Sequence, residues 1–366
     1  MLGWRNCRDL TFSFGNGVLE RVSMAMNPLV SILIPAFNAE RWIADTIKSA
    51  IGQTWPRTEI IIVDDGSRDS TLSVARQFAS RQISVVTQAN QGAAATRNYA
   101  LSLSQGDYIQ WLDADDLLSP NKIARQMEIV ARGAGKRMLL SSAWAWFMHR
   151  YHRAEFVPTA LWCDLSPVEW LLRKLANNLH MQTATWLVSR EVTEAAGPWN
   201  TQLLGDDDGE YFCRVLLASD GTRFTPDARV YYRMSGSSSL SYIGRSERKM
   251  EAQFVSMQLH IRYLRSLEES ERVRAACVKY LQNWLLNFYP ERLDIVHRAE
   301  QLARDLGGQL RVPPPLSWKY RWIQRSFGWS LAKRAQVFLP SYRWSLTRSW
   351  DKFLSRFDTR DLALSR

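Results

Sequence analysis

A cluster of carboxylates ends the apolar segment in Asp107-Tyr-Ile-Gln-Trp-Leu-Asp-Ala-Asp-Asp-Leu-Leu-Ser-Pro120. Residues 108–112 are typical of a short buried strand, and Ser119 and Pro120 are typical of the cap and first turn of a following helix. The carboxylates are therefore expected at the point where a strand ends.

Asp113 and Asp115 are two residues apart, so on an extended chain their side chains point the same way and can converge, while Asp116 begins the turn. Carboxylate oxygens suit Mg²⁺ or Mn²⁺, with substrate phosphates and water completing the coordination shell. The motif indicates a metal site for a diphosphate ligand. A solvated acidic turn that caps the next helix is the alternative for these residues taken alone.

Two earlier apolar runs also end in polar residues. Residues 29–34 lead into Pro35-Ala36-Phe37-Asn38, and residues 59–63 lead into Asp64-Asp65. Helical patterns separate these runs, so we expect a mostly parallel sheet flanked by helices, in which ligands bind beyond the carboxyl ends of the strands. Polar clusters at three such ends favour the metal-diphosphate interpretation over the capped turn.

Four segments resemble, in order and spacing, the signatures of family 2 glycosyltransferases. They are residues 30–38, 63–71, 90–98 and 112–116. The resemblance covers residues 29–131 and implies the A-type glycosyltransferase fold (GT-A). It also implies a nucleotide-diphospho-sugar donor, here expected to be a UDP-sugar, and inversion at the anomeric carbon.

The same resemblance implies roles for particular residues. In that family the loop after the first strand and the second acid of the Asp-Asp pair contact the nucleoside, and the Asp-x-Asp motif handles ribose and the metal-bound diphosphate. The implied donor-binding residues are Pro35, Ala36, Asn38, Asp65 and Asp113, and the implied metal ligands are Asp115 and Asp113.

Arg97 lies on the first turns of a helix predicted for 93–104, which follows Gly92. A helix N-terminus behind a glycine is a favourable neighbour for an anion, although an ordinary capped helix is the alternative. We count Arg97 among the candidate donor-binding residues.

A second acidic cluster at 205–210 precedes a helix predicted for 211–218. Aligned on Arg214, it resembles the family's acidic pair, with Asp208 at the catalytic base and Asp207 at the acid before it. Three consecutive aspartates leave both assignments of the base open. A carboxylate at a helix N-terminus suits the role of base, because the helix fixes its position. Helix capping with solvation is the alternative.

The predicted organisation has three parts: an N-terminal tail at 1–28, a catalytic domain at 29–244 and a helical, basic region at 245–366. The catalytic domain divides into a nucleotide-sugar half at 29–131 and an acceptor half at 132–244. All of the net charge of +11 belongs to 245–366, which has 23 Lys and Arg against 12 Asp and Glu. The true start of the chain is expected at Met1, Met24 or Met26.

The last part of the basic region, 311–366, holds 12 Lys and Arg against 3 acids, together with five tryptophans. A helix predicted from Ser341 places Trp350, Phe353 and Phe357 on one face, which is typical of an element that lies on an anionic membrane surface. The alternative is a helix that packs this face on its own protein. No base-stacking motif accompanies the charge, so nucleic-acid binding is not expected.

The four cysteines have no paired spacing, and no apolar run reaches the ~20 residues of a spanning helix. We expect a cytoplasmic protein, peripheral on the inner face of a membrane. Membrane-spanning synthases of the resembled family carry Gln-x-x-Arg-Trp, whereas Trp318-Lys-Tyr-Arg-Trp322 lacks the Gln. We therefore expect a non-processive enzyme. A catalytically silent sugar-binding scaffold is the alternative function, and a glycoside hydrolase would have no use for the nucleotide-type motifs.

Overall fold

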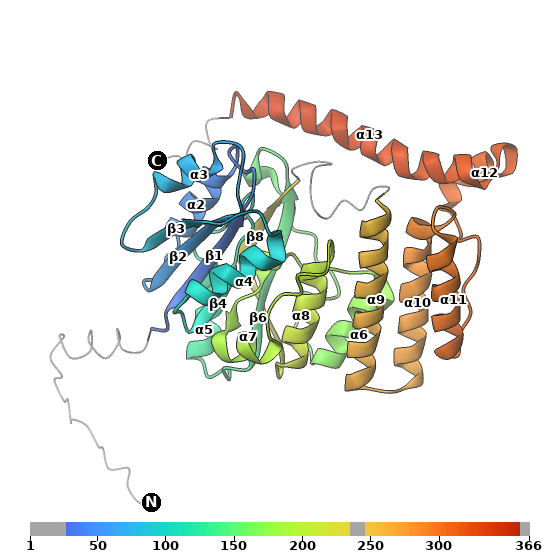
Figure 1. Cartoon of the computed structure of the whole chain (residues 1–366), viewed down its shortest axis with the longest axis horizontal. Coiled ribbons are helices and arrows are strands. Elements are labelled where there is room, and N and C mark those ends of the chain that lie inside the picture. The colour runs from blue at the N-terminus through green and yellow to red at the C-terminus, as the bar shows by residue number, and fades with distance from the viewer. Residues whose placement is uncertain (1–26, 235–245, 359–366) are drawn as a thin grey trace, which may run out of the picture.

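The computed structural model describes residues 27–234 and 246–358 of the 366-residue chain. Nearly all of the predicted tail at 1–28, with the candidate starts Met24 and Met26, lies outside these ranges. Figure 1 shows a sheet with flanking helices beside a row of long upright helices, and one long helix, α13 (Trp329–Ser355), running across both. The expected α/β architecture with a helical C-terminal region is confirmed.

Within residues 27–234, five strands form the main sheet in the order β3-β2-β1-β4-β7. They are β1 (Val30–Ala36), β2 (Thr58–Asp64), β3 (Ile83–Thr87), β4 (Tyr108–Trp111) and β7 (Val188–Ser189). The first four are parallel, and β7 runs antiparallel to β4. The strand β1 is a continuous apolar run because nearly every side chain in it is buried. The loops that follow β1, β2 and β4 therefore open at the same edge.

The helices of this half are α2 (Ile43–Ile51), α3 (Thr71–Arg76), α4 (Ala93–Leu103) and α5 (Lys122–Ala131). The prediction that a helix starts at Ser119 and Pro120 is wrong. Helix α5 begins at Lys122. The preceding Leu117–Leu118 pairs as strand β5 with β8 (Gly221–Arg233), so Ser119 and Pro120 lie in the turn between this strand and the helix.

A second sheet in the same described segment has the order β5-β8-β6, with β6 spanning Met138–Phe147. The strands β6 and β8 are parallel, and β8 carries extra residues opposite Ser142/Ala143. This half also contains α6 (Pro167–Asn177), α7 (Arg190–Ala196), α8 (Asp207–Leu217) and the 3-10 turns η1 (Tyr151–Arg153) and η2 (Thr183–Thr185).

The helical region consists of α9 (Glu247–Leu267), α10 (Glu271–Phe288), α11 (Leu293–Asp305), the 3-10 turn η3 (Trp318–Tyr320), α12 (Arg321–Phe327) and α13. The predicted helix from Ser341 is wrong at its start, since α13 begins at Trp329 and runs through Pro340. A proline inside a helix removes one backbone hydrogen bond, and a helix of 27 residues keeps the others.

Helix α13 is tied to the rest of the molecule at both ends. Near its start, the ammonium of Lys333 lies 2.5 Å from the carboxylate of Glu291. Near its end, Asp351 accepts hydrogen bonds from the backbone of His149 and forms an ion pair of 2.7 Å with Arg150. Among the described residues, no helix is long and apolar enough to cross a membrane.

Candidate active site

The acidic turn after β4 is held by its backbone. The hydroxyl of Thr46 on α2 donates to the carbonyl of Ala114 at 3.0 Å, and Nε of Arg233 donates to the carbonyl of Asp115 at 2.7 Å. The side chains of Asp113 and Asp115 remain partly exposed at the carboxyl end of the sheet. The carboxylates of Asp113 and Asp115 thus reach the surface, while the backbone carbonyls of the turn are hydrogen-bonded to the protein.

Asp116, the last acid of this turn, is fully buried. One carboxylate oxygen accepts a hydrogen bond of 2.8 Å from the backbone N–H of Arg233, and the other accepts from the amide of Gln182. Burial, followed by the charges of Asp115 and Asp113, raises the pKa of Asp116 well above its ordinary value. Asp116 anchors the turn and does not face a ligand.

Asp65, at the end of β2, organises the loop that enters α4. Its carboxylate accepts hydrogen bonds from the backbone N–H groups of Gln91 and Gly92, both at 2.9 Å, and from the side chains of Gln88 and Asn90. Both carboxylate oxygens therefore bind groups of the protein itself. The contact of Asp65 with a nucleoside stays a prediction.

The loop after β1 is fastened to the loop after β2. Asn38 has a left-handed φ of 49°, its N–H donates to the hydroxyl of Ser67, and its side-chain oxygen accepts from the N–H of Arg68. Ala36 is buried and Pro35 partly buried. The structure therefore places these candidates together at the edge where Asp113 and Asp115 lie.

The second acidic cluster begins on Asp206, whose φ of 54° turns the chain into α8. Its carboxylate accepts hydrogen bonds from Ser256 at 2.6 Å and from Gln253 at 3.2 Å, both on α9. A Cβ at position 209 would lie 2.1 Å from an Asp206 oxygen, so this close approach requires Gly209. The helix begins at Asp207, four residues earlier than predicted, and Asp207 and Asp208 lie on its first turn.

Arg97 joins the two acidic clusters. One guanidinium nitrogen lies 2.8 Å from the carboxylate of Asp113 and the other lies 2.8 Å from that of Asp207. The guanidinium also stacks on the ring of Trp199, 4.4 Å from its centroid. Asn98, the next residue, exchanges two hydrogen bonds with the backbone of Trp199 and so fixes that segment against α4.

Asp208 follows Asp207 on the first turn of α8. It accepts hydrogen bonds from the N–H of Gly209 at 2.8 Å and from the hydroxyl of Thr183 at 3.4 Å. Burial, then the charges of Asp207 and Asp206, raise the pKa of Asp208 to about 7, against the opposing effect of Arg97. A carboxylate with a pKa near neutrality is suited to accept a proton.

The oxygen atoms at the acidic turn fit a hard divalent cation. Asp113 and Asp115 supply carboxylates at one end of the sheet, and among the described residues no group of three or more His, Cys, Asp or Glu side chains forms a closed metal cage. A site with two carboxylates needs further oxygen ligands, which is the arrangement expected where a diphosphate completes the shell.

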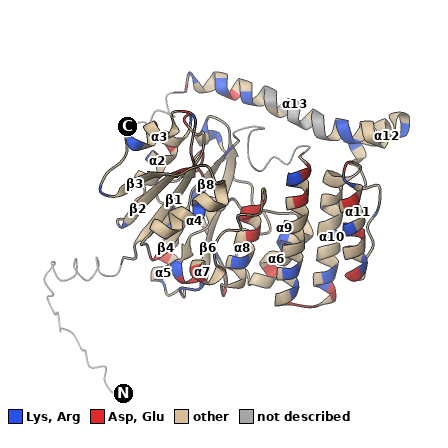
Figure 2. Cartoon of the chain, in the orientation of Figure 1, with Lys and Arg blue, Asp and Glu red and all other residues tan. Residues whose placement is uncertain are grey.

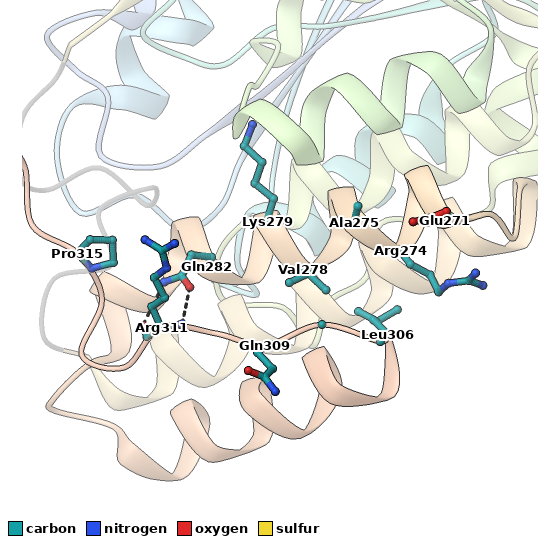
Figure 3. Close-up of a pocket in the computed structure, with 12 residues that line it drawn as sticks. Glu271, Arg274, Ala275, Val278, Lys279, Gln282, Leu306, Gln309, Arg311 and Pro315 are labelled. Atoms are coloured by element: carbon teal, nitrogen blue, oxygen red, sulfur yellow. Dashed lines mark hydrogen bonds between the residues drawn. The ribbon is translucent and has the colours of Figure 1, made fainter.

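A groove of about 710 Å³ lies elsewhere, on the helical region (Figure 3). It runs between α10 and the loop after α11, past Val278, Leu306 and Arg311, and contains no residue of the two acidic clusters. Figure 2 shows acids gathered at the start of α8, well away from α10 and α11. The groove is therefore separate from the candidate active site.

Several residues of the site were not predicted from the sequence. They are Arg233, Gln182, Thr183 and Trp199. The burial of Asp116 was not predicted either. Arg233 lies 117 residues from Asp116 and Gln182 lies 66 residues from it, with no motif around either.

This fold and its acidic edge define a GT-A type glycosyltransferase domain. The family model described as glycosyl transferase family 2 matches residues 31–191, so this part of the chain is a family 2 glycosyltransferase domain.

Curated relatives match about a third of this chain. An uncharacterized glycosyltransferase of Rickettsia typhi is 34% identical over 131 residues, covering 36% of this chain and 41% of the relative. The putative teichuronic acid biosynthesis glycosyltransferase TuaG of Bacillus subtilis is 42% identical over 106 residues, covering 28% of this chain and 42% of TuaG. The chain thus spans about two fifths of the length of these relatives.

Among solved structures, S. aureus TarS 1-349 in complex with UDP-GlcNAc is similar, with a TM-score of 0.55 and 16% sequence identity. The superposition covers 76% of this chain and 89% of that one. At this identity the likeness shows the shared fold.

Proposed function

We propose that the chain is an inverting, metal-dependent glycosyltransferase that moves a sugar from a nucleotide-diphosphate donor to a hydroxyl of a glycan or lipid-linked acceptor. The observation that carries this proposal is the bridge of Arg97 between Asp113 and Asp207. It brings two acidic clusters, one of them 110 residues from Arg97, around one place at the carboxyl end of the sheet.

The first cluster is proposed to bind the donor. Asp115 and Asp113 would hold Mg²⁺ or Mn²⁺, which when bound neutralises the charge of the departing diphosphate. Asp65 and Asn38, with the backbone around Pro35, would line the nucleoside site. A uridine donor is supported by the likeness to a TarS structure that contains UDP-GlcNAc.

The second cluster is proposed to act on the acceptor. Asp208 takes the proton from the acceptor hydroxyl while the oxygen of that hydroxyl attacks the anomeric carbon, on the side opposite the departing diphosphate. Asp207 forms an ion pair with Arg97 and so fixes the position of the first turn of α8, which carries Asp208. This division supports Asp208 over Asp207 as the base, because a carboxylate paired with a buried guanidinium is a weaker proton acceptor.

Isothermal titration of the full chain with UDP tests the donor half of the proposal. We expect binding with Mn²⁺ or Mg²⁺ and at least tenfold weaker binding with EDTA, with GDP and TDP as comparison ligands. Absence of binding by every nucleoside diphosphate with either metal would remove the proposal.

A catalytically silent sugar- or nucleotide-binding scaffold is the second candidate. The observation favouring it is that the carboxylates of Asp65 and Asp113 are already engaged by protein donors. Such a scaffold would bind UDP weakly, show no transfer to any glycan, and keep its cellular role after Asp115→Ala.

We also propose that the enzyme is non-processive and acts in cell-envelope polysaccharide synthesis, at the cytoplasmic face of a membrane. Helices α12 and α13 support this location. Among the described side chains, the exposed aromatic residues on these helices and just after α13 are Trp322, Phe327, Trp344, Trp350, Phe353 and Phe357, and the exposed cations are Arg321, Arg325, Arg334, Lys352 and Arg356. The one acid of α13, Asp351, is turned toward Arg150. Anionic lipid therefore fits this surface.

Co-sedimentation of the full chain with vesicles tests the membrane proposal. Replacing Trp350, Phe353 and Phe357 together by Ser should reduce pelleting with anionic vesicles at least tenfold, and added salt should weaken it further. The control variant replaces Val157 and Leu293, which are exposed elsewhere, by Ser. Equal pelleting of both variants, or no preference for anionic vesicles, would contradict the membrane location.

A further inference from the structure

Four aromatic rings gather where β6 and β8 end: Trp144, Trp146, Tyr232 and His180. The ring of Trp146 lies 4.5 Å from that of Tyr232, 4.9 Å from that of Trp144 and 5.8 Å from that of His180, measured between centroids. Trp144 is 6% exposed and Trp146 is 41% exposed. A buried indole therefore supports an outward-facing one whose orientation is fixed by its neighbours.

The strand pattern explains which face carries these rings. Trp146 pairs with Tyr232 across β6 and β8, and Phe147 pairs with Arg233 one residue further on. Since side chains alternate along a strand, the rings of Trp146 and Tyr232 share one face and Phe147 and Arg233 share the other. The guanidinium of Arg233 lies 4.4 Å from the ring of Phe147 and contacts the acidic turn. The rings of Trp146 and Tyr232 therefore point away from the side of the sheet on which Phe147 and Arg233 contact each other.

His180 connects the ring cluster to the segment that bonds to the second acidic cluster. His180 precedes Thr183 by three residues, and the hydroxyl of Thr183 donates to Asp208. The ring of His180 lies 4.9 Å from that of Trp144 and 5.8 Å from that of Trp146, measured between centroids.

We propose that the exposed ring of Trp146, bordered by Tyr232 and His180, is the platform on which the acceptor sugar stacks beside Asp208. One face of a pyranose ring presents C–H groups and its edge presents hydroxyls. An aromatic ring covers the apolar face and leaves the hydroxyls in reach of polar groups. The substrate class is therefore a glycan whose accepting residue is a pyranose with an apolar face. This inference rests on the proposed function, because it assigns the acceptor of that reaction.

Saturation-transfer NMR of the full chain with UDP and Mg²⁺ tests the platform. The probes are methyl glycosides of glucose, galactose, mannose and N-acetylglucosamine in both anomeric forms, with ribitol as a polyol that has no ring face. We expect the ring C–H protons of at least one glycoside to receive the strongest saturation. Trp146→Ala should weaken its binding about tenfold, Trp146→Phe should retain part of it, and ribitol should show none.

The matched control is Trp318→Ala, which removes an indole that is 73% exposed on the helical region. Its glycoside binding should equal that of the unchanged chain, and all variants should keep their unfolding temperature. The proposal is overturned if no glycoside is saturated, if Trp146→Ala binds as the unchanged chain does, or if ribitol binds equally well through Trp146. Titration of the same samples with UDP separates the two ideas. Lost UDP binding contradicts the proposed function, whereas intact UDP binding with glycoside binding indifferent to Trp146 contradicts the platform alone.

Discussion

The two acidic clusters share two kinds of contact but have different surroundings. In each, one acid anchors the chain, Asp116 in the first and Asp206 in the second. In each, another acid pairs with Arg97, Asp113 in the first and Asp207 in the second.

The remaining acids differ. Asp115 and Asp208 are both partly exposed, but Asp115 lies on a turn after a strand, whereas Asp208 lies on the first turn of a helix with a pKa raised to about 7. A carboxylate at the end of a strand suits a cation and its phosphates, and one with a pKa near neutrality suits proton transfer. Surroundings, more than residue type, would thus separate the proposed metal ligand from the proposed base.

Asp208→Asn should have the largest effect, because it removes the proton acceptor and keeps the shape of the side chain. We expect the rate of transfer to fall about 10³-fold, within the range for loss of a general base, with UDP affinity unchanged within twofold. Steady-state kinetics and titration measure the two quantities. Asp207→Asn is the matched variant. If it is inactive while Asp208→Asn turns over normally, the base is Asp207.

Asp115→Ala should act on the other cluster. It removes a proposed metal ligand, so the metal-dependent part of UDP binding should fall about 100-fold. Titration with and without Mn²⁺ measures this part. Asp220→Ala, which removes an acid that pairs with Arg137 away from the site, is the control and should leave UDP binding intact. UDP binding that stays equally metal-dependent in Asp115→Ala would assign the metal to other residues.

Arg97→Lys should affect both clusters at once, since an ammonium cannot reproduce a guanidinium that spans two carboxylates. We expect losses of about tenfold in UDP affinity and about tenfold in turnover, in contrast to the one-sided losses above. Arg190→Lys is the control, because Arg190 donates to Gly106 and Ser104 away from the site. A loss confined to one quantity would show that the bridge serves only one cluster.

The pH dependence should be the smallest effect. Asp208 must be deprotonated to accept a proton, so turnover should rise with pH through about 7 and level off above it. Stability has the opposite sign, because a raised carboxylate pKa lets the folded state bind more protons, so stability falls as pH rises between about 4 and 7. Asp208→Asn should therefore unfold at a higher temperature than the unchanged chain at pH 8 and at a similar one at pH 4. Thermal scans at both values check this.

Much of the nucleotide half could be predicted from its sequence. Apolar runs that end in polar residues gave strands close to β1, β2, β3 and β4, because buried parallel strands impose a continuous apolar pattern. The same strand ends pointed to Asp65, Asp113 and Asp115. The bond from Arg233 to Asp115 could not be predicted, since it joins residues 118 apart through a strand pairing that no local pattern encodes.

The errors in the helical region have a related cause. Pro340 favours a helix that starts after it, yet the contacts of Lys333 and Asp351 stabilise one helix on both sides of it. Tertiary contacts outweigh one missing backbone bond, and they cannot be seen in a local window.

The pairing of Arg150 with Asp351 also has a consequence for the order in which parts of the chain fold during synthesis. The two residues are 201 positions apart, so at 5–20 residues per second the loop after β6 leaves the ribosome ~10–40 s before its partner is made. During that interval the sheets can fold, but the end of α13 cannot yet dock on them. Docking of the end of α13 is therefore expected to be a late folding step, in which this helix returns to sheets that are already folded.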